Sequence, residues 1–263
     1  MPEPVLILIP PSEGKATGGN GPTWAAGTSR FGALDRPRRT VMTALQRGLA
    51  ADPATLLGVK GDALAAAVRS DRAVRRSATM PAIERFSGVL YDALDATTLS
   101  ARARRRLDER VVIVSGLFGA LGPADPIPDH KLKMSASLPG VGKLSTFWRP
   151  HLDAALEPVV GGATVWDLLP NEHAAAWSGG RAAARRIVVR FLDDVERDGR
   201  RRLVTVSHWN KLLKGALVRH LVDTGADDTS GLAAFSHPQG YTYRPELTTI
   251  DGTVETVSMV AVR

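Results

Sequence analysis

Continuous apolar runs are the feature that most constrains the fold of this chain. Val5–Ile9 reads VLILI between two prolines, and Val111–Val114 reads VVIV. A strand with one solvent-exposed face alternates apolar and polar residues, whereas an unbroken apolar run predicts a strand buried on both faces, as in parallel sheets. Three further segments are strand candidates, although flanking arginines leave a helix open for the last: Thr164–Leu169, Leu203–Ser207 and Ile187–Phe191.

Segments with helical spacing alternate with these strands. Arg38–Ala51 repeats apolar residues at helical spacing, and Asp52 offers an N-cap before two helical segments expected over residues 52–76. Three more helices are expected over Pro81–Leu94, Ser100–Arg110 and Leu212–Val222. Because there is no internal repeat and no clear linker, we predict one mixed α/β domain over residues 1–263, with a central mixed sheet flanked by helices.

Two stretches depart from this alternation. Residues 10–37 are rich in Gly, Pro, Ser and Thr and predict a long loop, which in a compact domain is usually functional. The C-terminal stretch from Tyr241 to Val262 alternates weakly and predicts a β-hairpin that turns at Asp251-Gly252.

The composition excludes several classes of protein. The chain has no cysteine, which excludes a disulfide scaffold, a thiolate zinc site and a cysteine nucleophile, and fits a reducing cytoplasm. No apolar stretch approaches the roughly 20 residues that span a bilayer. We therefore expect a soluble, cytoplasmic protein without a membrane partner.

Basic residues outnumber acidic ones by 34 to 27, which gives a formal net charge of +7. This balance favours polyanions such as nucleic acid, or phosphorylated small molecules, as partners. The alternative is a general arginine bias, which is common in proteins of GC-rich organisms.

The first candidate motif is the turn after the first strand, Ile9–Lys15, which reads IPPSEGK. It resembles a phosphate-binding loop but fails the Walker pattern, because that pattern needs glycine where Ile9 stands and Ser or Thr where Ala16 stands. The turn nevertheless delivers Lys15 to an edge of the sheet.

A second glycine turn follows the second strand, in the stretch VSGLFGALGPAD at residues 114–125. Consecutive backbone N–H groups after Ser115 could hold a phosphate, and the Gly116–Gly119 spacing resembles the turn of helix-hairpin-helix modules that hold a DNA backbone. The alternative is a tight turn between two elements. Downstream, Lys131 and Lys133 precede the aromatic pair Phe147-Trp148. The lysines could contact backbone phosphates while the aromatic rings stack on bases. The alternative is a solvated basic loop followed by two aromatic residues of the core.

Two further clusters combine charge with strand or helix ends. Glu172 and His173 follow the Thr164–Leu169 strand, where α/β proteins place chemistry, although Asn171 and Glu172 also fit the start of a helix. In the last cluster, Lys211, Gly215 and Arg219 are spaced by four residues and therefore lie along one line of a helix. Because like charges on one face repel each other, we expect this line to face an anion. The alternative is a solvated helix face. The members of this cluster are Ser207, His208, Lys211, Lys214, Gly215 and Arg219.

Other familiar constellations are missing from the sequence. There is no G-x-G-x-x-G after a strand and no G-x-S-x-G, and the six histidines lack H-x-x-x-H or H-E-x-x-H spacing. We therefore expect no metal site and no cofactor.

Taken in order, the motifs resemble one known family. They are PPSEGK, FSGVLYDAL at 86–94, VSGLFGALGPAD at 114–125, KLKM at 131–134, TFW at 146–148, LLPNE at 168–172, SHWNK-x-x-KG-x-x-x-R at 207–219 and GY at 240–241. Over residues 5 to about 245 the chain resembles the YaaA family of bacterial peroxide-stress proteins.

The resemblance implies a one-domain α/β fold with a positively charged cleft and a helix-hairpin-helix-like element. It also implies protection against hydrogen peroxide, control of unincorporated iron and binding of duplex or distorted DNA. The family's polar pattern falls on Lys15, Ser115, Gly116, Gly119, Asp125, Lys131, Glu172, Lys211, Lys214, Arg219 and Tyr241.

The chain departs from the better-known members of the family at several positions. They read S-P-A-K where this chain has the longer PPSEGK, Tyr where it has Phe118, and aromatic residues where it has His130 and His173. The chain therefore resembles a divergent branch of the family.

Two hypotheses follow for a protein that we expect to be a monomer. In the first, which we place slightly ahead, the protein holds the phosphates of duplex or distorted DNA, largely independently of the DNA sequence. The groups that would contact the phosphates are the Gly116–Gly119 turn, Lys131, Lys133, Lys211, Lys214 and Arg219.

In the second hypothesis, an enzyme acts on a nucleotide or another anionic small molecule, and Glu172 is the base or electrostatic stabiliser. Lys15 and Lys211 would fix the anion, and Ser115 and Asp125 would orient it. Cleavage of an N-glycosidic bond is one such reaction. The enzyme hypothesis requires Lys15, Ser115, Glu172 and Lys211 to converge in a pocket too narrow for duplex DNA.

Overall fold

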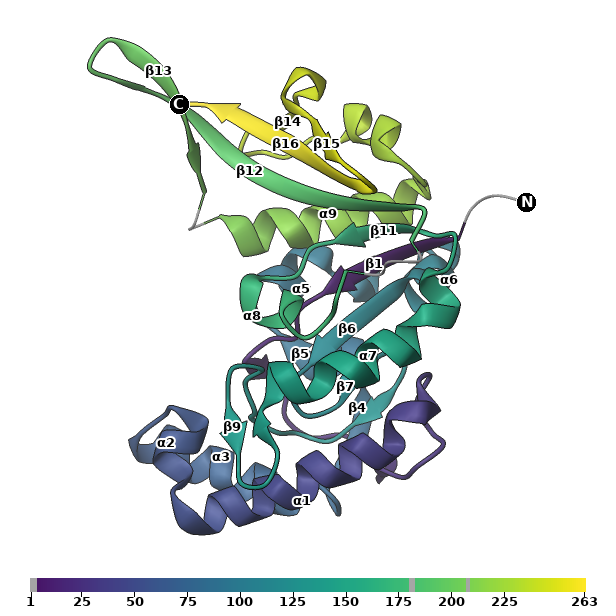
Figure 1. The fold of residues 1–263 in the computed structure, drawn as a ribbon, viewed down its shortest axis with the longest axis vertical. Coiled ribbons are helices and arrows are strands. Elements are labelled where there is room, and N and C mark those ends of the chain that lie inside the picture. Colours follow the sequence, from purple (N-terminus) through teal and green to yellow (C-terminus); the bar gives the residue numbers. More distant parts are fainter. Residues whose placement is uncertain (1–3, 180–182, 207–208) are drawn as a thin grey trace.

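In the described residues, 4–179, 183–206 and 209–263 of a computed structural model, a nine-stranded mixed sheet forms the centre of the molecule (Figure 1). Its order is β14-β16-β12-β11-β1-β6-β7, with β13 paired to β12 and β15 paired to β16. The mixed α/β class and the central sheet flanked by helices are confirmed. The strands of this sheet are β1 Val5–Ile9, β6 Val111–Ser115, β7 Gly119–Leu121, β11 Thr164–Asp167, β12 Arg185–Arg197, β13 Arg200–Thr205, β14 Thr242–Tyr243, β15 Thr249–Asp251 and β16 Val254–Val262.

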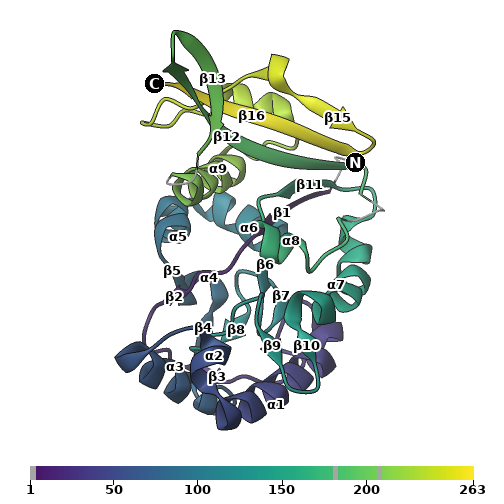
Figure 2. The same ribbon diagram turned by 60° about the vertical axis from the view of Figure 1, so that its left-hand side comes forward.

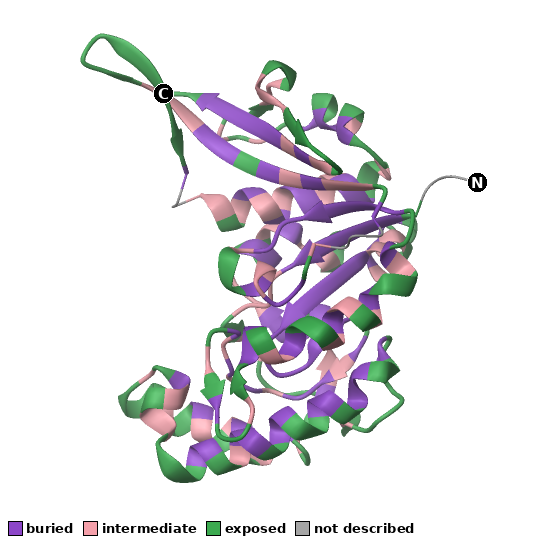
Figure 3. Ribbon diagram, in the orientation of Figure 1, coloured by how far each residue is buried: buried purple, intermediate pink, exposed green. Residues whose placement is uncertain are grey.

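The centre of the sheet is parallel, as the continuous apolar runs predicted. β1 lies between β6 and β11 and pairs with both in parallel, and every residue of β1, β6 and β11 is buried (Figure 3). The chain goes from β1 outward to β6 and then crosses back to β11 on the other side of β1. The strand order therefore reverses between β1 and β11, and this reversal is the topological switch point of the sheet.

Helices cover both faces of this parallel core (Figure 2). On one face, α7 turns a single apolar stripe inward, in which Trp148, Leu152 and Leu156 follow at intervals of four. On the other face, α5, α6 and α9 pack together. The main helices are α1 Asp35–Ala51, α2 Pro53–Leu57, α3 Gly61–Ala73, α4 Ala82–Arg85, α5 Val89–Leu94, α6 Ala101–Arg110, α7 Leu144–Val160, α8 Asn171–Ala174 and α9 Asn210–Thr224.

Helices α1, α2 and α3 lie at the end of the molecule opposite β12–β16 (Figure 1). Between them and the main sheet run three small sheets, two of which take up part of the stretch 10–37 that the sequence predicted as a loop. Four short 3-10 helices complete the described fold: Gly32–Leu34, Ala96–Thr98, Thr229–Ala234 and Pro245–Leu247. The small sheets contain β2 Gly14–Lys15 with β5 Phe86–Ser87, β3 Gly21–Thr23 with β4 Ala78–Pro81 and β8 Pro126–Ile127, and β9 Ser137–Leu138 with β10 Gly142–Lys143.

Local predictions differ in outcome. The hairpin at Asp251-Gly252 is confirmed by β15 and β16, and Ile187–Phe191 is a strand, within β12. The single helix predicted over Pro81–Leu94 is wrong, because Gly88, at φ +108°, separates α4 and β5 from α5. The strand at Leu203 is exposed and belongs to an antiparallel ribbon with β12 that projects from the body (Figure 3).

The Gly116–Gly119 turn joins β6 to β7, and these strands pair directly, with Ser115 opposite Gly119. A helix-hairpin-helix turn joins two helices, so the structure does not show that element at these residues. The turn is buried, with Leu117 and Phe118 at 0% exposure. Among the described helices, none is long and apolar enough to cross a membrane.

Candidate functional site

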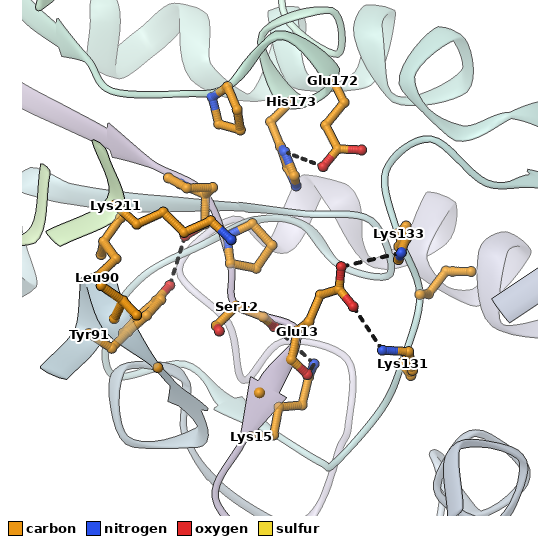
Figure 4. A pocket seen from close by; sticks show the side chains of 17 residues that line it. Ser12, Glu13, Lys15, Leu90, Tyr91, Lys131, Lys133, Glu172, His173 and Lys211 are labelled. Atoms are coloured by element: carbon orange, nitrogen blue, oxygen red, sulfur yellow. Dashed lines mark hydrogen bonds and ion pairs between the residues drawn. The ribbon is translucent and has the colours of Figure 1, made fainter. Parts of the chain in front are cut away.

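A pocket of about 370 Å³ opens at the switch point between β1 and β11. The turn after β1 supplies one wall, and the segment after β11 supplies another, because parallel strands end at the same edge of the sheet. Lys131 and Lys133 form a third side and Lys211 of α9 lies opposite them (Figure 4). The lining residues are Pro10, Pro11, Ser12, Glu13, Gly14, Lys15, Gly88, Val89, Leu90, Tyr91, Lys131, Leu132, Lys133, Pro170, Glu172, His173 and Lys211.

Lysine is concentrated at this pocket in a chain that otherwise uses arginine. The 34 basic residues include only seven lysines, and four of them line the pocket: Lys15, Lys131, Lys133 and Lys211. They come from three segments far apart in the sequence. Lysine is a compact point charge that suits phosphate groups, and its pKa responds readily to burial.

Lys15 is held by the turn that carries it. Its Nζ donates to the carbonyl oxygens of Ser12 at 3.1 Å and Glu13 at 3.4 Å and lies 5.4 Å from the ring centre of Phe86. Burial lowers its pKa to about 8, and Asp129 opposes this shift. At neutral pH the side chain is therefore largely cationic but close to losing its proton.

A buried carboxylate lies beneath this side of the pocket. Asp71 is 0% exposed, accepts the backbone N–H of Lys131 at 2.7 Å through Oδ1, and leaves Oδ2 buried without a hydrogen bond. Burial raises its pKa to about 7, although the Lys131 N–H and the charge of Lys15 pull it down. Asp71 thus anchors the segment that carries Lys131 and Lys133.

Glu172 and His173 stand above the lysines, at the start of α8 (Figure 4). The Glu172 side chain is 44% exposed, and its Oε1 lies 3.6 Å from His173 Nδ1, too far for a hydrogen bond. Nδ1 is buried and has no hydrogen-bond partner. Burial lowers the pKa of His173 to about 4, so the imidazole is neutral at pH 7.

The remaining lining is apolar. Pro10, Leu90, Tyr91 and Leu132 form much of it, and the Tyr91 hydroxyl donates to the Pro10 carbonyl at 2.9 Å. A site with apolar walls and a few converging charged groups is typical of a small-molecule pocket.

Four predicted site residues lie in the interior near β6 and outside this lining. Ser115 is 1% exposed and does not line the pocket, so it does not converge there with Lys15, Glu172 and Lys211 as the enzyme hypothesis required. A Cβ on Gly116 would lie 2.7 Å from the Leu132 carbonyl oxygen. Gly119, at φ +71°, packs against the Trp148 ring. The Asp125 carboxylate accepts the backbone N–H groups of Arg30 and Gly122 and lies outside the pocket lining, so it stabilises a turn, contrary to the expectation that it orients the bound anion.

The helical line of Lys211, Gly215 and Arg219 faces α5, contrary to the expectation that it faces an anion. A Cβ on Gly215 would lie 2.1 Å from the Leu90 carbonyl oxygen, so the glycine permits close packing of the two helices. Arg219 donates to the Leu94 and Asp95 carbonyls at the C-terminal end of α5. Only Lys211, at the start of α9, reaches the pocket.

Two predicted residues have internal partners elsewhere. Lys214 Nζ donates to the Leu168 carbonyl at 2.8 Å, just after β11, and burial lowers its pKa. Tyr241 is 0% exposed and its hydroxyl donates to Asp193 at 2.6 Å. Ser207 and His208 lie outside the described residues.

Of the eleven predicted site residues, the structure therefore brings four into one pocket: Lys15, Lys131, Glu172 and Lys211. Glu13 and Asp71 had no predicted role. Glu13 belongs to the PPSEGK motif, so its position in the sequence was a usable signal. Asp71 lies in an ordinary helical segment and only its burial marks it. No group of three or more potential metal ligands is present among residues 4–179, 183–206 and 209–263.

Comparisons with known proteins agree on one family. The family model described as peroxide stress protein YaaA matches residues 5–247. A UPF0246 protein of Streptomyces coelicolor is 37% identical over 224 residues, covering 84% of each chain. A UPF0246 protein of Corynebacterium efficiens is 31% identical over 97% of this chain and 100% of its own, and one of Cereibacter sphaeroides is 35% identical over 66% and 68%. The chain therefore belongs to the YaaA family of peroxide stress proteins.

Proposed function

We propose that this YaaA-family protein binds an anionic small molecule of the nucleotide class in the switch-point pocket. The observation that carries the proposal is the convergence of Lys15, Lys131, Lys133 and Lys211 with Glu172 around one concave site. Lysines on three sides can surround phosphate oxygens, and the apolar wall at Leu90 and Tyr91 suits the face of a base or ribose.

The size of the pocket favours a small ligand over duplex DNA. About 370 Å³ is within the range of small-molecule sites, roughly 300 to 1,000 Å³. Two parts of the surface that the DNA hypothesis needed are occupied by internal contacts, since Arg219 binds carbonyls at the end of α5 and the Gly116–Gly119 turn is buried. Lys131 and Lys211, which that hypothesis also used, line the pocket instead.

Glu172 is our candidate for acid–base chemistry on the bound molecule. Its carboxylate lines the pocket, is 44% exposed and lies beside a neutral imidazole (Figure 4). A carboxylate in this position can accept a proton from an attacking water or stabilise a developing positive charge, as N-glycosidic bond cleavage requires. The lysines then hold the anionic part of the same molecule.

Calorimetric titration tests the binding proposal. We expect ADP and AMP to bind the wild-type protein at physiological salt, and Lys211→Met to weaken ADP binding at least about tenfold. Lys143→Met is the matched control, because Lys143 is exposed on β10, outside the pocket, and it should leave binding unchanged. Glu172→Gln should keep binding and lose any turnover.

A duplex oligonucleotide in the same titration tests the DNA hypothesis. Duplex binding that falls steeply with salt, is unaffected by Lys211→Met, and occurs without any nucleotide binding would reject the pocket proposal.

A further inference from the structure

The Glu13 carboxylate spans two of the pocket lysines. Its Oε2 lies 3.0 Å from Lys131 Nζ and its Oε1 lies 3.3 Å from Lys133 Nζ (Figure 4). Each carboxylate oxygen therefore faces a different ammonium group, which is the arrangement that two oxygens of a phosphate would adopt. The hydrogen bond from Lys131 is the main cause that lowers the pKa of Glu13.

The turn that carries Glu13 is held firmly while the side chain stays accessible. A Cβ on Gly14 would lie 3.1 Å from the Ser87 carbonyl oxygen, so this turn packs directly against β5. Lys15 also closes the turn by donating to the Ser12 and Glu13 carbonyls. The Glu13 side chain is nevertheless 63% exposed. An exposed ion pair is weak, so a ligand can replace this carboxylate at little cost.

The other two lysines of the pocket, Lys15 and Lys211, have no carboxylate partner among the described residues. In the same part of the chain, Lys15 Nζ donates hydrogen bonds only to carbonyl oxygens. One part of the pocket therefore holds a built-in anion, and another part offers cations without one.

Building on the proposed function, we infer that Lys131 and Lys133 form an anion subsite that Glu13 shares with the ligand. In this structure the carboxylate occupies the subsite, and the terminal anionic group of a bound molecule displaces it. Lys15 and Lys211 then meet a second anionic group of the same molecule. The ligand class is accordingly one with two linked anionic groups, such as a nucleoside diphosphate.

Titration of inorganic pyrophosphate into wild-type protein and Glu13→Gln tests this inference. Removing the competing carboxylate should tighten pyrophosphate binding at least about threefold. A ligand no longer has to break the exposed ion pair of Glu13 with the lysines, and the repulsion between the carboxylate and the bound anion is also removed. Inorganic phosphate should gain less than pyrophosphate, because it engages one subsite. Glu157→Gln on the exposed part of α7 is the matched control and should change nothing.

A second pair of variants checks the location of the effect. Adding Lys131→Met and Lys133→Met to Glu13→Gln should cancel the gain, and melting curves should show that all variants are folded. Weaker or unchanged pyrophosphate binding in Glu13→Gln would overturn the inference, since Glu13 would then contact the ligand directly or lie outside its path. If ADP binds the wild type and this result is obtained, only the inference fails; if neither protein binds ADP or pyrophosphate, the proposed function fails with it.

Discussion

The turns that follow β1 and β6 are the same feature in two different settings. Both leave adjacent parallel strands at the same sheet edge, and both contain glycines beside polar residues. The turn after β1 lines the pocket with Glu13 and Lys15. The turn after β6 folds back as β7 and is buried.

The two turns differ in whether later segments of the chain pack over them. The segment around Leu132 lies directly on Gly116, and Trp148 of α7 covers Gly119 and donates to the Gly116 carbonyl at 2.8 Å. Beside the first turn, α8 contributes Glu172 and α9 contributes Lys211 to the lining of an open pocket. Of these two glycine turns, only the one after β1 is left uncovered by later elements and lines a pocket.

The largest effect is expected from filling the covered turn. In Gly119→Ala the new Cβ would lie 2.7 Å from the Trp148 ring at φ +71°, so strain and overpacking should lower the free energy of unfolding by roughly 3 to 5 kcal/mol. Urea denaturation measures this loss. Gly140→Ala has a similar φ of +73° with no atom within 4 Å, and should cost only roughly 1 kcal/mol. Equal losses would show that Trp148 does not define this turn.

The next effect concerns Asp71 beneath the open pocket. Its pKa is raised from 3.8 to about 7 in the folded protein. Between about pH 4 and pH 7 the folded state therefore binds a proton at Asp71 that the unfolded state has released, and the free energy of unfolding of the wild type should fall as the pH rises through this range. In Asp71→Asn this component is absent, and the two proteins should diverge by roughly 2 to 4 kcal/mol across that range. Unfolding curves at several pH values measure the difference. Asp62→Asn, on the exposed part of α3, is the control, and parallel curves for Asp71→Asn would contradict the assignment.

A smaller effect is expected from Lys214, the lysine near the pocket that has an internal partner. Lys214→Met loses the hydrogen bond to the Leu168 carbonyl, so we expect a stability loss of about 1 kcal/mol. ADP affinity should stay within about twofold of wild type, because Lys214 does not line the pocket. Affinity loss as large as that of Lys211→Met would move Lys214 into the binding site.

The smallest effect is the pH dependence of anion binding at Lys15. Because burial lowers its pKa to about 8, its charge is lost as pH rises from 7 to 9, and ADP affinity should fall severalfold over this range. Titrations at pH 7, 8 and 9 measure the change. Lys15→Met should bind more weakly at pH 7 and show a flatter profile. A wild-type affinity that is constant across these values would exclude a contact between Lys15 and the anion.

The parallel core and much of the pocket were predictable because both depend on local patterns. Unbroken apolar runs placed β1 and β6, and parallel strand ends placed Lys15 and Glu172 at one edge. The covering of the Gly116–Gly119 turn was not predictable, because it depends on Trp148, about 30 residues away in the sequence. Arg219 was misread for a similar reason, since its carbonyl partners lie on α5, more than 100 residues earlier.

A crystal structure of the protein with ADP would show directly where the nucleotide binds. We predict that the diphosphate lies in the switch-point pocket, with phosphate oxygens about 3 Å from the Nζ atoms of Lys131 and Lys211, and with Glu13 turned away from Lys131. Nucleotide binding in this pocket would be contradicted if ADP lay elsewhere, for example on the exposed ribbon at residues 197–202, while the Glu13–Lys131 ion pair stayed intact.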